Sequence, residues 1–191
     1  TLEPVPRRIL ALYNSVEQRE SGSSTDVAYT PVHQHAAVAL EYLGYAIDYV
    51  DVEGSLPRGA LAEKYAGIVT WFTDEHVPNE ATYRSWLIEQ LESGLKVAVL
   101  EKLGFSLDSR LQQRLGLVLD EPQEISPVKL RSFDPAVIGF ETPIKVSRKA
   151  FYALRLAHPK ARSLLSLDAQ DGTRMDAVFT TWWGGMAAYP Y

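Results

Sequence analysis

The sequence predicts an α/β domain with a doubly wound, mostly parallel sheet and a C-terminal antiparallel β extension. In the N-terminal half, apolar strand-like runs alternate with amphipathic helical segments, which is the order of a doubly wound sheet. Residues 67–72 (GIVTWF) are apolar on both faces, as in a parallel strand covered by helices on either side. The C-terminal half instead contains short strand-like runs separated by turn signals, which favours antiparallel pairing.

The strands and helices of the N-terminal half follow from periodicity and from end signals. Strands are expected at residues 7–13, 45–52, 67–72 and 96–101, and helices at residues 31–43, 79–93 and 108–115. In the first helix, Thr30 is a suitable N-cap, Pro31 suits the first position and Gly44 ends the segment. In the second, Asn79 is a suitable N-cap and Gly94 ends the segment.

Two connecting segments are expected between these elements. Residues 14–30 are polar and contain the run Ser21-Gly22-Ser23-Ser24-Thr25, which predicts a mobile loop. Residues 56–65 predict a short helix or an irregular connection.

The C-terminal half predicts successive short strands. They are expected at residues 127–133, 142–146, 151–157, 163–168 and 174–182. The turns between them are expected at Asp134-Pro135, His158-Pro159 and Asp171-Gly172, and the last of these is a strong hairpin signal.

Length and composition limit the domain organisation and the class of partner. The 191 residues suit one domain, and we expect residues 1–6 to be a linker remnant before a single α/β domain at 7–191, cut from a longer multidomain chain. A net charge of −5 argues against a nucleic-acid binder and against adsorption to anionic lipid. The absence of cysteine excludes thiolate catalysis, and no apolar run has the length of a membrane span.

Polar side chains follow several predicted strands, at the ends where ligands bind in doubly wound sheets. The candidate ligand-contact residues are Asn14, Glu17, Tyr29, Thr73, Asp74, His76 and Glu101. Their carboxylates are also suited to acid/base chemistry. The structural alternative is that they are turn and cap residues, which are commonly acidic.

The turn after the strand at 96–101 has no nucleophile. It reads Glu101-Lys102-Leu103-Gly104-Phe105, with no Cys and no Gly-x-Ser-x-Gly. The glycine patterns of phosphate-binding loops and dinucleotide sites are also missing. His33 and His35 are two apart on a predicted helix and would point in different directions. We therefore expect no catalytic residue, no metal and no cofactor in this domain.

Trp182 and Trp183 follow the last predicted strand. Adjacent strand residues face opposite ways, so one indole is expected in the core and one at the surface. Both are candidate sugar or partner contacts, because an exposed indole is suited to stack on a sugar ring or to fill a partner pocket.

Residues 9–15 (ILALYNS), 67–72, 97–101 and 182–191 resemble the central domain of PelA-like proteins of bacterial Pel exopolysaccharide biosynthesis. The strand order also resembles class I glutamine amidotransferase-like (flavodoxin-like) folds and their inactive relatives in glycosidases. The resemblance implies a periplasmic parent chain with a glycoside hydrolase domain before this region and a polysaccharide deacetylase domain after it. No catalytic residue transfers, because Leu100–Gly104 has no Cys and the deacetylase Asp-Asp and His-x-x-x-His motifs are missing.

These observations predict a non-catalytic scaffolding or binding domain in biofilm matrix production. The resemblance implies the flanking hydrolase and deacetylase domains as partners, with an amino-sugar polysaccharide or an outer-membrane secretion partner as further ones. The alternative is a small carbohydrate-active or hydrolytic enzyme that uses the carboxylates at the strand ends. A nucleotide-binding protein is a third reading, which the missing glycine patterns oppose.

Overall fold

The computed structural model describes residues 6–123, 128–132, 144–145, 151–169 and 172–188. The chain forms two compact units, residues 1–106 and 107–191, which we describe separately. The expected single domain at 7–191 stays a prediction.

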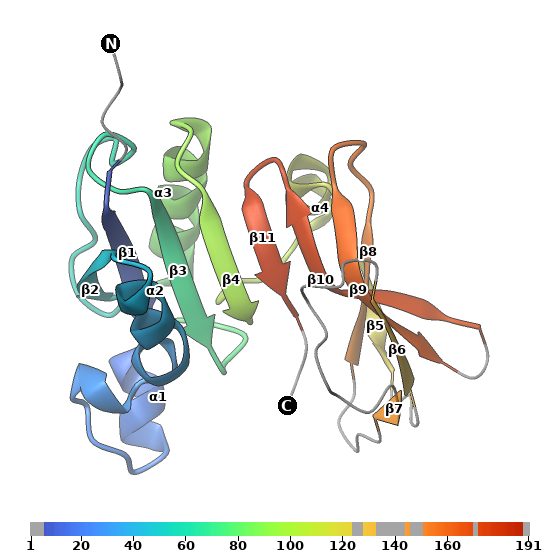
Figure 1. Ribbon diagram of the computed structural model, residues 1–191, viewed down its shortest axis with the longest axis horizontal. Helices are drawn as coiled ribbons and strands as arrows, with labels where there is room; N and C mark the ends of the chain where they lie inside the picture. Colours follow the sequence, from blue (N-terminus) through green and yellow to red (C-terminus); the bar gives the residue numbers. More distant parts are fainter. Residues whose placement is uncertain (1–5, 124–127, 133–143, 146–150, 170–171, 189–191) are drawn as a thin grey trace. The chain divides into compact units, whose positions relative to one another are not determined.

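The first unit is built on parallel strands in the order β2-β1-β3-β4 (Figure 1). Their bounds are β1 Arg8–Tyr13, β2 Ala46–Asp51, β3 Gly67–Phe72 and β4 Val97–Glu101. All of the neighbouring pairs run parallel, and β1 pairs with both β2 and β3. The four strands lie where the sequence predicts them. The strand order places the topological switch point between β1 and β3, where the chain turns from one side of β1 to the other.

Helices cover both faces of this sheet (Figure 1). On one face, the π-helix η2 (Val32–Ala37) buries Val32 and Ala36 against Ile9, Ala11 and Val69. It continues into α2 (Val38–Tyr42). On the other face, Tyr83 of α3 (Glu80–Glu92) contacts the Phe72 ring edge-to-face at 5.8 Å. The sheet is therefore doubly wound, as predicted.

The predicted loop at residues 14–30 is wrong in part, because two helical turns lie in it. Helix α1 (Ser15–Glu20) begins where the Asn14 side chain accepts a hydrogen bond from the Val16 N–H. The 3-10 helix η1 (Val27–Tyr29) begins in the same way at Asp26, which accepts from the Ala28 N–H. Short side chains that bind the backbone two residues ahead start both turns.

Two helix-end expectations also need correction. The first helix ends at Tyr42, so Leu43 lies outside its apolar stripe and is 65% exposed. Asn79 does precede α3, but its backbone is left-handed (φ 54°) and its side chain makes no capping bond. Residues 56–65 form an irregular connection, one of the two predicted options.

The second unit begins with α4 (Ser109–Leu115), as predicted. Asp108 caps it by accepting a hydrogen bond from the Leu111 N–H at 2.8 Å, and Gly116 ends it with a left-handed backbone. The strands that follow are antiparallel, which confirms the predicted C-terminal extension.

The antiparallel strands of this unit fall into two sets. One has the order β11-β10-β9-β6-β7, with β6 Val128–Ser132, β7 Ile144–Lys145, β9 Arg162–Ala169, β10 Arg174–Thr181 and β11 Gly184–Ala187. The other pairs β5 (Leu117–Gln123) with β8 (Phe151–Leu156). The sequence did not predict β5, which contains a proline, or β11, which begins with two glycines. The His158-Pro159 turn is present, Gly172 has a left-handed φ of 90°, and the Asp134-Pro135 turn and Asp171 lie outside the described residues.

Candidate functional site

The polar residues predicted to bind a ligand lie around the carboxyl ends of β1, β3 and β4. Because these strands are parallel, their carboxyl ends share one edge of the sheet. The register places Glu101 opposite Phe72 and Leu12 opposite Thr70. We call Asn14, Glu17, Thr73, Asp74 and Glu101 the strand-end cluster.

Glu17 ties α1 to the segment after β3. The residue is buried, with 7% of its surface exposed. Its carboxylate accepts hydrogen bonds from the Thr73 N–H, the Thr73 hydroxyl and the Asp74 N–H at 3.1–3.3 Å. Asn14, also buried, hydrogen-bonds to the same carboxylate. The structure thus brings four of the predicted residues together around one buried acid.

The environment of Glu17 shifts its protonation. Burial is the largest cause and raises the pKa of Glu17 above its ordinary value. The hydrogen bonds from Asp74, Thr73 and Asn14 oppose this shift because they stabilise the charged form. A carboxyl group with a raised pKa is suited to acid/base work, but here its oxygens are already bonded to the protein's own donors.

A second set of contacts fixes the other side of α1. The Glu53 carboxylate accepts hydrogen bonds from Arg19 at 2.7 and 2.8 Å and from the Ser15 hydroxyl at 3.0 Å. Asp51, at the end of β2, accepts from the Ser15 N–H at 3.3 Å. Helix α1 is therefore held between the ends of β2 and β3.

Glu101 is the last residue of β4, at the carboxyl end of the strand. Its backbone is left-handed (φ 71°), which is costly for a residue with a Cβ by about 1–2 kcal/mol. The turn is fixed by a Lys102 N–H bond to the Phe72 carbonyl at 3.2 Å. Trp71 Nε1 donates to the Glu101 carboxylate at 3.3 Å.

Gly104 completes this turn and has no room for a side chain. It has φ +82°, and an added Cβ would lie 2.8 Å from Val77 Cγ1 and 2.9 Å from the Phe72 ring. Its carbonyl accepts from the Val77 N–H at 2.9 Å. The turn after β4 is thus packed against the segment that leads into α3.

Sequence reasoning missed two aromatic neighbours of the cluster. The His35 ring, from η2, lies 5.3 Å from the Trp71 ring, and Trp71 in turn binds Glu101. The spacing of His33 and His35, two apart on a predicted helix, gives no hint of this contact. His33 instead bonds to the Tyr49 hydroxyl at 2.7 Å. Only the pairing of β3 with β4 brings Trp71 to Glu101.

The remaining predicted residues do not join the cluster. His76 bonds to Glu80 in the first turn of α3, and Glu80 also accepts from the Ser106 N–H. Tyr29 is 59% exposed, and no hydrogen bond or ring contact links it to the cluster in the described part of the chain.

The two tryptophans separate as expected, one in the core and one partly exposed. Trp183 is 1% exposed and its Nε1 donates to the Leu115 carbonyl at 2.9 Å. This corrects the candidate sugar contact at Trp183, since a buried indole with a bonded N–H offers no surface to a ligand. Trp182 is half-buried and stays a prediction as a contact residue.

Across the described ranges, no group of three or more His, Asp or Glu side chains is placed to hold a metal ion. In the same part of the chain, no helix combines the length and the apolar character that a membrane span requires.

Comparison with known proteins establishes the fold. A glutamine amidotransferase from Thermotoga maritima is similar over 98% of this chain and 76% of its own, with 13% identity and a TM-score of 0.55. The fold is class I glutamine amidotransferase-like. No family model matches the sequence, and no curated protein matches it.

Parts of larger glycosidases are similar to this chain as well. An α-L-fucosidase from Paenibacillus thiaminolyticus is similar over 94% of this chain with 12% identity and a TM-score of 0.56. A β-galactosidase from Rahnella sp. R3 is similar over 95% of it with 13% identity and a TM-score of 0.52. The chain spans 28% of the length of each of these two glycosidases.

Proposed function

We propose that this amidotransferase-like domain is a non-catalytic module of a periplasmic, PelA-like protein that modifies an exopolysaccharide. The observation that carries the proposal is the turn at Glu101. It keeps the left-handed backbone of a nucleophile turn, but its side chain is a carboxylate bonded to Trp71, and the sequence contains no cysteine.

The role would be to orient the flanking hydrolase and deacetylase domains and to contact the polymer or an outer-membrane secretion partner. Two observations support it. The α1 helix is braced on both sides, by Glu17 and by Glu53, which favours a rigid spacer over a mobile catalytic lid. The similarity to a region covering 28% of two glycosidases supports a domain that accompanies other domains in carbohydrate-active proteins.

The test compares the enzymatic activity of the wild-type protein with that of Glu101→Gln, which removes the carboxylate at the turn. The 191-residue chain is assayed with nitrophenyl glycosides, glutamine and N-acetylated amino-sugar oligomers, and no turnover is expected. In the full parent chain, Glu101→Gln should leave hydrolase and deacetylase rates unchanged. A turnover by the 191-residue chain that Glu101→Gln abolishes, with stability retained, would overturn the proposal.

A small hydrolytic or carbohydrate-active enzyme is the second candidate. It is favoured by the strain at Glu101 and by the raised pKa of Glu17, since both features are common at active sites. In this case Glu101→Gln and Asp74→Asn abolish an activity and hardly change the free energy of unfolding. If the substitutions change only stability, the two carboxylates are structural.

A further inference from the structure

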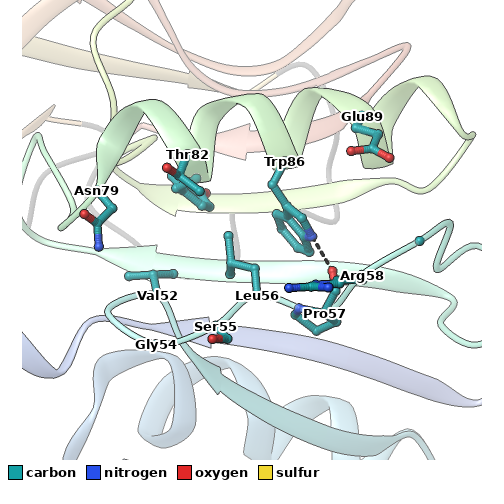
Figure 2. Close-up of a pocket in the computed structure, with 12 residues that line it drawn as sticks. Val52, Gly54, Ser55, Leu56, Pro57, Arg58, Asn79, Thr82, Trp86 and Glu89 are labelled. Carbon is teal, nitrogen blue, oxygen red and sulfur yellow. Dashed lines mark hydrogen bonds between the residues drawn. The ribbon is translucent and has the colours of Figure 1, made fainter.

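A groove runs along α3, and the proposed function does not use it. It has a volume of about 550 Å³, within the usual range for ligand sites. One wall is formed by Thr82, Trp86 and Glu89 of α3 and by Asn79, which directly precedes the helix. The other wall is the irregular segment after β2, at residues 52–59, and Figure 2 shows the two walls facing each other.

The groove is preformed, because hydrogen bonds join its two walls. Trp86 Nε1 donates to the Pro57 carbonyl at 2.7 Å, as drawn in Figure 2. Gln90 Nε2 donates to the Gly59 carbonyl, and the Gln90 amide oxygen accepts from the Leu61 N–H, both at 3.1 Å. A site whose walls are already fixed loses less conformational entropy when a ligand enters.

The polar side chains along the groove have no partner elsewhere among the described residues. They are Ser55, Arg58, Asn79, Thr82 and Glu89. Asn79 is the most telling of them, because a left-handed asparagine before a helix would ordinarily cap it, and this side chain makes no cap bond. Its amide is therefore available to a ligand, at the cost of a strained backbone.

The shape and the chemistry of the groove point to an elongated carbohydrate. Thr82 and Glu89 are seven residues apart on α3, so the helical part of this wall is about 10 Å long, and Asn79 extends it at the N-terminal end. Hydroxyl, amide, guanidinium and carboxylate groups alternate with the apolar Val52, Leu56 and Pro57, which suits a chain of sugar rings with polar edges and apolar faces. The opposite charges of Arg58 and Glu89, on a protein of net charge −5, disfavour a polyanion.

We propose that this α3 groove binds a short amino-sugar oligosaccharide. Arg58 and Asn79 would bond to its amide and hydroxyl oxygens, and Glu89 would pair with a free amino group. The ligand class rests on the proposed function, and the place, the α3 groove, goes beyond it.

The test uses the 191-residue chain and two probes, the tetramer of N-acetylglucosamine and its partly deacetylated form. Binding is measured by calorimetry and located by amide chemical shifts. We expect shifts at residues 55–59 and 79–89. Arg58→Ala and Thr82→Trp should weaken binding at least tenfold, whereas Arg110→Ala, an exposed control outside the groove, should not. Glu89→Gln should weaken binding of the deacetylated probe only, with Glu63→Gln as its control.

Asn79→Gly is a variant that is expected to fold like the wild type, so a loss of binding in it cannot be attributed to misfolding. Glycine adopts a left-handed backbone without strain, so the variant keeps the groove and removes only the amide. We expect unchanged or higher stability and weaker binding. Unaltered affinity in Thr82→Trp, or no binding to folded wild-type chain at millimolar probe, would overturn the inference. Binding with shifts at Glu101 and Asp74 would also overturn it, but would leave the polymer-binding form of the proposed function standing.

Discussion

Trp71 and Glu101 lie on neighbouring parallel strands, and the Trp71 indole N–H donates to the Glu101 carboxylate at 3.3 Å. The contact places a large aromatic side chain beside a turn whose backbone is left-handed at a residue other than glycine. It also gives the carboxylate a defined position, although the residue is only half-buried.

The first prediction separates backbone strain from side-chain bonding at this turn. Glu101→Ala loses the Trp71 bond and keeps the strain, so the free energy of unfolding should fall by about 1 kcal/mol. Glu101→Gly loses the same bond but relieves the strain of the left-handed backbone. It should therefore be more stable than the alanine variant by about 1 kcal/mol. Urea unfolding of both variants measures the difference. A glycine variant with a lower free energy of unfolding than the alanine variant would contradict backbone strain at this turn.

The second prediction concerns the acceptor role of Glu17. Glu17→Gln replaces one acceptor oxygen with an NH₂ group, which leaves a Thr73 or Asp74 donor without a partner. We expect a loss of about 1–3 kcal/mol in the free energy of unfolding at pH 7. Glu20→Gln, an exposed neighbour in α1, is the control and should change stability by less than about 0.5 kcal/mol. Equal effects of the two substitutions would show that the bonds to Thr73 and Asp74 contribute little.

The third prediction is the pH dependence that Glu17 imposes. Burial raises its folded pKa above the unfolded value, so the folded state binds more protons in the window between the two. Stability from this residue should therefore fall as the pH rises from its ordinary pKa through the raised one. The stability difference between wild type and Glu17→Gln, measured by urea unfolding from pH 4 to 8, should shrink along this window. A difference that grows with pH would mean that hydrogen bonding outweighs burial.

The fourth prediction tests the packing of the turn after β4. Gly104→Ala adds a Cβ 2.8 Å from Val77 at a left-handed position, so steric overlap and strain add together. We expect a loss of about 2–4 kcal/mol. Gly22→Ala has a similar left-handed backbone (φ +71°) and nothing within 4 Å of the added Cβ, so it should lose only about 1 kcal/mol. Thermal unfolding of the two variants isolates the overlap, and similar losses would show that Val77 and Phe72 move aside.

The strands of the parallel sheet could be predicted from the sequence because each has a strong local signal. The apolar runs at 9–12 and 67–72 predict buried parallel strands, and Asp108 with Gly116 marks both ends of α4. The helix at 15–20 was missed because its apolar content is low and it is held by distant partners. Glu17 bonds to a segment 56 and 57 residues away, and Arg19 to one 34 residues away.

The candidate site could be predicted only in outline. Parallel strands bring their carboxyl ends to one edge, which is why Asn14, Glu17, Thr73 and Asp74 were named together. The Trp71–Glu101 contact depends on which strands are neighbours, and the α3 groove depends on a connection that has no periodic pattern. The left-handed backbone at Glu101 has no signal in the sequence, since a glutamate at the end of a strand ordinarily keeps an extended backbone.

The turn after β4 owes its shape to the backbone around it, through the Lys102–Phe72 bond and the close packing of Gly104. The identity of residue 101 therefore has little influence on where its Cβ is placed. The backbone fixes the direction of the Cα–Cβ bond at position 101, so a carboxylate, a thiol or an amide at this position would start from the same place and point the same way. A protein with such a position can gain or lose a reactive group by one codon change without rebuilding its scaffold.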